Sequence, residues 1–238
     1  MKTLGVIGGL GPMATAYFLQ LITQMSDAAN DQEHMEVITI SKPSIPDRTR
    51  YILGISNENP VTDMVSIGKR LKECGADMLA IPCITAHYFH DELEEKTGLP
   101  VIHAIKETAS CLQGLGIERV GIMGTDGTVQ SGLFQNCMNG YGISCVLPEE
   151  EMQRKIMHMI YDQVKAGKTV DISCFYDIVE RLFQRDAQVV LLACTELSLI
   201  KRDYKLPPGC LDVMEVLAGK AVKSCNRLRK EYQNLITK

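Results

Sequence analysis

Two cysteines in this sequence stand in matching surroundings. Cys83 ends the apolar run LAIPC at 79–83, and Cys194 ends the apolar run VLLAC at 190–194. A threonine follows each of them closely, at Thr85 and Thr195. A buried cysteine is often an inert packing residue, but a thiol between a strand and a helix can have its thiolate stabilised by the helix N–H groups. The matched positions favour chemistry at both cysteines.

Two thiols on opposite sides of a carbon centre can invert that centre. One of them, as a thiolate, removes a proton from one face, and the other, as a thiol, returns a proton to the opposite face. A single base tends to return its proton to the face from which it came. The pair of cysteines therefore predicts an enzyme that inverts a carbon centre.

A weak internal repeat supports this pairing. GVIG at 5–8 resembles GIMG at 121–124, and an alanine lies seven positions before each cysteine, at Ala76 and Ala187. Each half is expected to hold a first strand that ends in glycine and a later strand that ends in cysteine. Ligands of open α/β sheets bind at the carboxyl ends of the strands, so both cysteines are expected at one cleft.

Four other features are candidates for the same site. The loop GGLGP at 8–12 follows a strand and opens a helix, so its N–H groups can approach an anion, although a tight turn without a ligand explains it equally well. Gly124 and Thr125 are its counterpart in the second half. Arg48 can hold a carboxylate through two parallel hydrogen bonds, with a surface salt bridge as the alternative. His87 lies four residues after Cys83, although a packing role is more common for such a histidine.

Short apolar runs alternate with helical patterns along the whole chain. This alternation predicts an α/β fold with parallel strands covered by helices on both faces. The predicted strands are 4–8, 36–40, 78–83, 100–104, 120–124, 144–147 and 189–194. The predicted helices are 13–29, 61–74, 90–96, 105–115, 127–140, 150–166, 174–185 and 212–235.

The composition narrows the class of protein. The net charge is −4, and no Lys/Arg stripe of the kind that binds nucleic acid is present. We see neither a secretory signal nor a membrane segment, so we expect a cytoplasmic protein whose nine cysteines stay reduced. The cysteine spacing is not that of a zinc site, and no metal is expected.

The motifs GGLGP, IPDRT, PCITAH, Gly124-Thr125 with Thr128, and ACTEL occur in this order along the chain. From about Gly5 to Ala218 the sequence resembles the aspartate/glutamate racemase superfamily, and within it the aspartate racemase branch. The resemblance implies two pseudo-symmetric α/β domains, each a mostly parallel sheet flanked by helices, with the active site in the interdomain cleft. It also implies racemisation without pyridoxal phosphate or metal, on a small amino-acid substrate and commonly in a homodimer.

The resemblance also implies roles for individual residues. Cys83 and Cys194 take the positions of the two catalytic cysteines. The α-carboxylate and amino group would be bound by Thr85, Thr125 and Thr195, and the side-chain carboxylate by Arg48 and Lys165. Glu196 and His87 would assist the adjacent thiols. Gly9, Leu10, Gly11 and Ile84 complete the predicted substrate-binding set.

Two positions depart from the family pattern. Ile84 stands where the family usually has asparagine, and Val213 stands where the family commonly has threonine. Both changes make the predicted pocket more apolar. A polar substrate group that finds no hydrogen-bond partner there would lose roughly 1–3 kcal/mol of binding free energy.

The sequence therefore predicts a cofactor-independent racemase of aspartate or glutamate, with residues 1–105 plus 211–238 as one domain and 106–210 as the other. One alternative is an enzyme of the same fold that acts on a less polar substrate; hydantoin racemases, maleate isomerases and malonate decarboxylases share the superfamily. Another alternative is an amino-acid-binding protein that has lost turnover.

Overall fold

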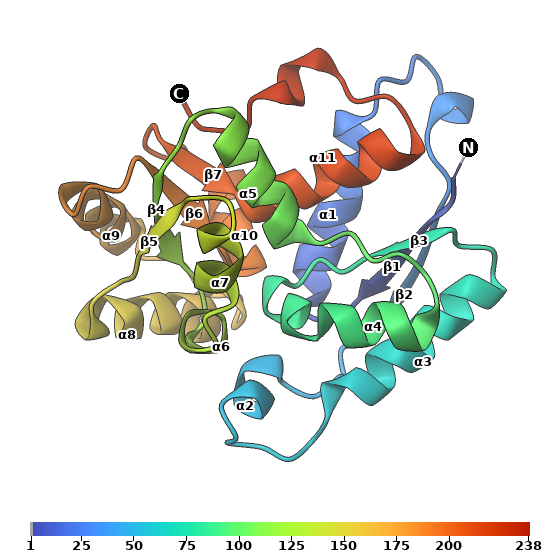
Figure 1. The fold of residues 1–238 in the computed structure, drawn as a ribbon, viewed down its shortest axis with the longest axis horizontal. Coiled ribbons are helices and arrows are strands. Elements are labelled where there is room, and N and C mark those ends of the chain that lie inside the picture. Colours follow the sequence, from blue (N-terminus) through green and yellow to red (C-terminus); the bar gives the residue numbers. More distant parts are fainter. Residues whose placement is uncertain (1) are drawn as a thin grey trace.

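The computed structural model describes residues 2–238, in which two parallel sheets lie side by side and helices cover them (Figure 1). The first sheet has the order β2-β1-β3, with strands β1 (Leu4–Gly8), β2 (Val37–Ser41) and β3 (Met78–Ala80). The second has the order β5-β4-β6-β7, with strands β4 (Arg119–Met123), β5 (Ser144–Val146), β6 (Val189–Leu192) and β7 (Cys210–Asp212). All strand pairs are parallel. We refer to the parts that carry these sheets as the three-stranded half and the four-stranded half.

The helices follow the strands in the alternation that the sequence predicts. They are α1 (Pro12–Met25), α2 (Arg48–Ile52), α3 (Pro60–Glu73), α4 (His90–Thr97), α5 (Ala104–Gly114), α6 (Asp126–Gln130), α7 (Leu133–Asn139), α8 (Glu150–His158), α9 (Ile172–Gln184), α10 (Thr195–Asp203) and α11 (Val213–Cys225). The 3-10 helices are Asp31–Glu33, Ile84–Phe89 and Lys230–Gln233, and Met159–Val164 is a π-helical turn.

The two halves share one apolar core. Helices α1, α5 and α11 contribute to it, together with residues from strands of both sheets, such as Val6 of β1 and Val120 of β4. Helix α1 buries Ala14, Phe18 and Leu21 at helical spacing, and this spacing gives it one apolar face. Two further apolar clusters lie on the outer sides, around α3 and β3 in one half and around α8, α9 and β6 in the other. The shared core fixes the position of one sheet relative to the other.

The structure differs from the predicted elements in several places. The run 100–104 is not a strand, since only Val101 makes a single bridge to Leu79. The predicted helix 127–140 is two helices, because Gly132 adopts φ +70 between α6 and α7. The predicted helix 212–235 ends at Cys225. Strand β7 was not predicted; its three residues are too few for a periodicity.

The division into two domains remains a proposal. Strand β7 pairs with β6 of the four-stranded half, so a boundary between 210 and 211 passes through a strand of that sheet. Helix α11, which follows β7, packs against both α1 and α5. A boundary after Asp212 would keep the second sheet together.

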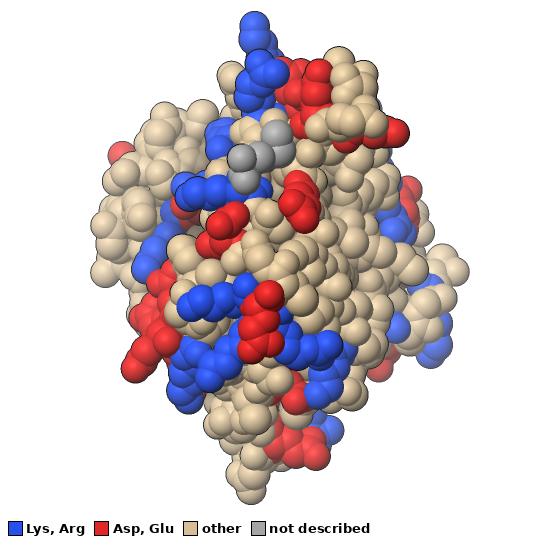
Figure 2. Space-filling view, turned by 90° about the vertical axis from the view of Figure 1, so that its right-hand side faces the viewer, with Lys and Arg blue, Asp and Glu red and all other residues tan. Residues whose placement is uncertain are grey.

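No helix within residues 2–238 is long and apolar enough to cross a membrane. On the face that Figure 2 shows, positive and negative side chains lie among one another.

Candidate active site

Ten of the predicted site residues line one small cavity between the two halves. The three-stranded half contributes Leu10, Arg48, Cys83, Ile84 and Thr85, and the four-stranded half contributes Thr125, Lys165, Cys194, Thr195 and Glu196. The cavity volume is about 10 Å³. A cavity of that size holds about one water molecule, so an amino acid can enter only if the walls move apart.

Both cysteines occupy the position that precedes a helix. Cys83 is the N-cap of the 3-10 helix Ile84–Phe89, and Cys194 is the N-cap of α10. Their side chains are buried, with exposed fractions of 6% for Cys83 and 5% for Cys194. Both cysteines line the same cavity, which agrees with the prediction that the ends of two corresponding strands bring them to one cleft.

Cys194 is held by a carboxylate. Its Sγ donates to Oε2 of Glu196 over 2.9 Å. Burial raises the pKa of Cys194 well above its ordinary value, and the negative charge of Glu196 raises it further, against a smaller opposing effect of Lys165. Cys194 is therefore a protonated thiol at neutral pH.

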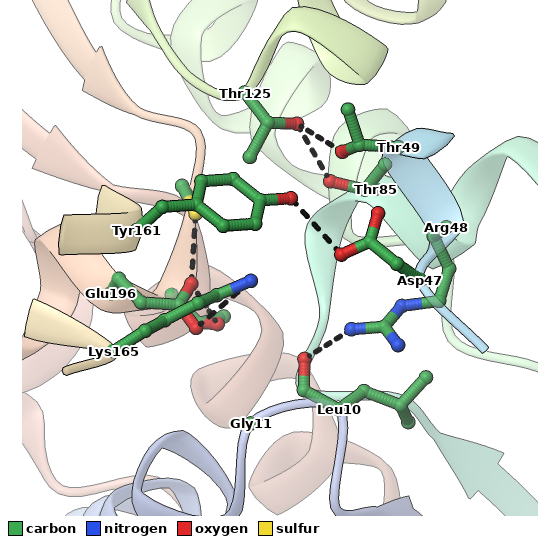
Figure 3. Close-up of polar contacts among 12 residues, drawn as sticks. Leu10, Gly11, Asp47, Arg48, Thr49, Thr85, Thr125, Tyr161, Lys165 and Glu196 are labelled. Carbon is green, nitrogen blue, oxygen red and sulfur yellow. Dashed lines mark hydrogen bonds and ion pairs between the residues drawn. The ribbon is translucent and has the colours of Figure 1, made fainter. Parts of the chain in front are cut away.

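Arg48 lies on the opposite wall, and its guanidinium is largely bound by backbone carbonyls. Its Nη1 donates to the carbonyls of Ile45 and Pro46, over 3.3 and 3.0 Å, and its Nη2 donates to the carbonyl of Leu10 over 2.8 Å. The Leu10 bond is visible in Figure 3. These bonds fix the start of α2 to the glycine loop that precedes α1.

Lys165 and Tyr161 project from the π-helical turn and its end toward the same space (Figure 3). The Nζ of Lys165 lies 3.8 Å from Oε1 of Glu196 and 4.1 Å from the centre of the Tyr161 ring. The Tyr161 hydroxyl donates to Oδ2 of Asp47 over 3.2 Å and so connects the two halves. Burial lowers the pKa of Lys165, but the negative charge of Glu196 is the largest of the opposing effects, which together raise the pKa above its ordinary value. Lys165 is a cation inside the site.

Four threonine hydroxyls form a buried cluster at the other end of the cavity. Thr125 bonds to Thr49 over 3.2 Å, and to Thr85 and Thr128 over 3.1 Å each. Thr85 also lies 3.1 Å from Thr128. Thr49 and Thr85 come from the three-stranded half, and Thr125 and Thr128 from the other. Hydroxyls that donate and accept can turn toward a carboxylate or an ammonium group.

Three predicted site residues do not line the cavity. Gly9 adopts φ +90 and donates its N–H to Oγ1 of Thr15, over 2.9 Å, and a side chain at this position would collide with the backbone of Lys42. Gly11 lies at the edge, where an added Cβ would be 3.1 Å from Oε1 of Glu196. The ring of His87 lies against His103, with 5.7 Å between ring centres.

Three residues that line the cavity, Asp47, Thr49 and Tyr161, were not predicted from the sequence. Asp47 and Thr49 flank Arg48 within the IPDRT segment, so their proximity to the site could have been foreseen. Tyr161 had no sequence signal, because it lies inside the predicted helix 150–166, between Ile160 and Asp162. Among the described residues no group of three or more His, Cys, Asp or Glu side chains is arranged to hold a metal ion.

Residues 7–221 match the family model described as Asp/Glu/Hydantoin racemase. The chain belongs to the Asp/Glu/hydantoin racemase family. The predictions of the family, of the α/β fold and of an amino-acid racemase as the class of enzyme are confirmed.

Solved structures of related racemases have the same architecture. The aspartate racemase of Picrophilus torridus is 32% identical, with a TM-score of 0.81 over 98% of each chain. A glutamate racemase of Francisella tularensis, solved with D-glutamate, is 17% identical, with a TM-score of 0.64 over 94% of this racemase and 80% of that chain. Among curated sequences, the broad specificity amino-acid racemase RacX of Bacillus subtilis is 23% identical over 227 residues, 93% of this racemase and 97% of that protein.

Proposed function

We propose that this racemase interconverts the enantiomers of an acidic amino acid, aspartate or glutamate, without pyridoxal phosphate. Cys83 and Cys194 are the two acid/base groups. The observation that carries the proposal is that the two thiols, from corresponding strand ends of different halves, line one cavity that also contains the cation Lys165. The 32% identity to an aspartate racemase supports the choice of an acidic substrate.

The reaction needs two proton transfers. The thiolate on one side takes the α-proton, so that the C–H bond breaks and an S–H bond forms. The thiol on the other side gives its proton to the opposite face of the carbanion and becomes a thiolate. The threonine hydroxyls around Thr125 are placed to hold the α-carboxylate, and Lys165 to attract the side-chain carboxylate. No group outside the chain is needed to balance these steps.

One observation favours a second candidate, a racemase for less polar amino acids. Ile84 lines the cavity between the catalytic Cys83 and Thr85, and its side chain is buried in the shared apolar core. An apolar side chain at this position cannot hydrogen-bond to a polar substrate group. The relative RacX is described as a broad specificity amino-acid racemase, which supports this second candidate.

Incorporation of deuterium from solvent tests both candidates. The purified protein is incubated in D₂O with each enantiomer of aspartate, glutamate, alanine, leucine and methionine, and the α-proton is followed by NMR. Exchange and racemisation confined to aspartate or glutamate support the first candidate. Faster exchange of leucine or methionine supports the second, and no exchange with any amino acid refutes both.

We also propose a homodimer, which sedimentation equilibrium tests.

A further inference from the structure

A buried carboxyl that the two proton transfers do not use lies beside the strand end that leads to Cys194. Asp212 is the last residue of β7 and the N-cap of α11, and its side chain is fully buried. Its Oδ1 accepts from the N–H of Met214, over 2.9 Å, and from the hydroxyl of Ser198 in α10, over 2.7 Å. One carboxyl oxygen therefore caps α11 and joins it to α10.

Asp212 contacts the chain on both sides of the segment that carries Cys194. In the sheet it is paired with Leu192, the last residue of β6, and its partner Ser198 lies one helical turn after Cys194. The segment 193–197 between these two contacts includes three residues that line the cavity: Cys194, Thr195 and Glu196. Asp212 therefore fixes both ends of this segment.

A second polar contact lies between the same two helices. The Nζ of Lys201 is 2.6 Å from Oε2 of Glu215, and both side chains are mostly buried. Lys201 follows Ser198 by three residues in α10. Glu215 follows Asp212 by three residues at the start of α11. Residues three apart lie on one helix face, so the two contacts together fix the register of α10 along α11.

We infer that Asp212 is a positioning residue for Cys194, because its contacts with Leu192 and Ser198 hold the segment 193–197 at the cavity wall. The inference rests on the proposed function only for the role of Cys194 as an acid/base group. Asp212 itself does not line the cavity. A misplacement of about 1 Å at a reacting group can cost about 10²-fold in rate, so a bond outside the cavity affects the reaction.

The second carboxyl oxygen indicates that Asp212 carries a proton below neutral pH. Oδ2 is buried and has no hydrogen-bond partner within the part of the chain that the structure describes. Burial, followed by the charge of Glu215, raises the pKa of Asp212 from 3.8 to about 7. The nearby cation Lys201 is bound by Glu215. A proton on Oδ2 leaves Oδ1 free to accept from Ser198.

The other ionisable groups that face Asp212 come from α1 and α10, and they do not balance its charge. Arg202 donates to both carboxylate oxygens of Asp203, over 2.7 and 2.8 Å, and lies over the ring of Tyr17. The Tyr17 hydroxyl stays neutral, because burial, followed by the charge of Asp212, raises its pKa. Asp212 is therefore neutralised by a proton rather than by a cation.

Amide hydrogen exchange of the full-length protein tests the positioning role without turnover. Ser198→Ala removes the bond to α10 and leaves the cap of α11, so we expect the amides of α10 to exchange about 10-fold faster or more, while those of α3 keep their rate. Ser26→Ala is the matched control, since it removes a buried hydroxyl bond of the same length, to the carbonyl of Ile22 in α1, and should leave α10 unchanged. If Ser198→Ala leaves α10 unchanged, or speeds α10 and α3 equally, the inference is wrong.

Two changes at Asp212 separate its acceptor from its volume. Asp212→Asn keeps an oxygen that can accept from Ser198 and should keep the exchange of α10 close to that of the wild type. Asp212→Leu has a similar size but no acceptor, so it should reproduce the fast exchange of Ser198→Ala. If Asp212→Leu does not fold, Ser198→Ala decides alone. Fast exchange of α10 in Asp212→Asn would contradict the role of the acceptor.

Urea unfolding at pH 5 and pH 8 tests the proton on Asp212. Between pH 3.8 and about 7 the folded chain holds a proton here that the unfolded chain has released, so this stability is present at low pH and is lost as pH rises through 7. We expect the wild-type midpoint to fall by about 0.5 M urea or more relative to that of Asp212→Asn, which cannot titrate. Asp171→Asn, at the exposed N-cap of α9, should follow the wild type. Parallel midpoints in the wild type and Asp212→Asn would overturn the assignment of this proton.

The outcome is separable from that of the deuterium experiment. In an active racemase, Ser198→Ala should lower kcat by about 10-fold and change KM by less than about twofold, because Lys165 and the threonine cluster lie outside the segment 193–197. If the exchange of α10 changes as expected and no amino acid exchanges its α-proton, the inference stands and the proposed function fails. If the wild type racemises and Ser198→Ala keeps its kcat, the function stands and Asp212 does not position Cys194.

Discussion

The hydroxyl oxygens of Thr85 and Thr125 lie 3.1 Å apart, although the two residues belong to different halves of the molecule. Thr125 is also the N-cap of α6, where its side chain accepts from the N–H of Thr128. One buried hydroxyl therefore stabilises a helix start and joins the two halves at the candidate active site.

Replacing this hydroxyl should lower the stability of the folded chain. We expect Thr125→Val to lower the free energy of unfolding by about 1–2 kcal/mol, because it removes a cap and leaves neighbouring hydroxyls with fewer partners. Thr125→Ser keeps the hydroxyl and should cost less than half as much. Urea unfolding of the two variants measures the difference, and equal losses would mean that the methyl group matters as much as the hydroxyl.

Each cysteine should be indispensable for inversion. We expect Cys83→Ser and Cys194→Ser each to reduce racemisation by about 10³-fold or more, since residues that act as a unit fail together. Both changes are small in volume and should leave the circular dichroism spectrum unchanged. Cys210→Ser is a matched control, because Cys210 is buried in β7 and does not line the cavity. Near-normal racemisation in either of the first two variants would remove that cysteine from the mechanism.

The sequence was sufficient to predict the cysteine pair because the signal is local and occurs twice. An apolar run followed by Cys and Thr marks the end of a buried strand. The two strands belong to different sheets, and the residues that follow them line one cavity between the halves. His87 was predicted because it lies four residues after Cys83, and it does not line the cavity. Four residues after Cys83, the 3-10 helix turns this ring toward His103 instead.

Tyr161 shows which part of the site the sequence could not give. The predicted helix 150–166 is α-helical only to His158, and Met159–Val164 forms a π-helical turn. A π-helical turn adds a residue to one turn and rotates every later side chain relative to an α-helix. The position of Tyr161 beside Asp47, and of Lys165 beside Glu196, depends on this turn. A periodicity of 3.6 residues contains no sign of it.

Loss of the two cations should have different consequences. We expect Lys165→Met to raise KM for aspartate or glutamate by about 10-fold or more, with little effect on any neutral substrate, because a charge-assisted hydrogen bond contributes roughly 1.5–3 kcal/mol. Arg48→Leu should instead lower kcat for acidic and neutral substrates alike, since its donors serve the backbone carbonyls of Pro46 and Leu10 and so hold the wall of the cavity in place. Steady-state kinetics on both substrate classes distinguish these results. A selective loss of activity on acidic substrates in Arg48→Leu would instead support its assignment as a ligand of the side-chain carboxylate.

Glu196 should set the alkaline limit of activity. Cys194 acts as an acid only while it is protonated, and both burial and the charge of Glu196 raise its pKa. Removing that charge in Glu196→Gln lowers the pKa of Cys194, so the alkaline limb of the kcat/KM profile should move to lower pH. Glu150→Gln, at an exposed position of α8, changes the net charge equally and should leave the limb in place. Movement of the limb to higher pH in Glu196→Gln would contradict the role given to Glu196.

His87 should make the protein less stable in acid. Burial, followed by the charges of His103 and His90, lowers the pKa of His87 from 6.5 to about 3 in the folded chain. Between these two values the unfolded chain binds one more proton at this position. The free energy of unfolding therefore falls as pH falls through this window, by up to about 1.4 kcal/mol per pH unit from this residue.

The variant His87→Leu has nearly the same volume and cannot bind a proton, so it should lose less stability between pH 7 and pH 5 than the wild type. Urea unfolding at the two pH values measures this difference, with His158→Gln as a control, because His158 lies on an exposed helix surface. Within residues 2–238 neither ring nitrogen of His87 has a side-chain or backbone hydrogen-bond partner, so the substitution breaks no bond there that could hide the effect. The same loss of stability in His87→Leu and in the wild type would show that the ring is protonated in the folded chain. A buried imidazolium would then lie beside His103, and the charges of His103 and His90 could not be lowering the pKa of His87.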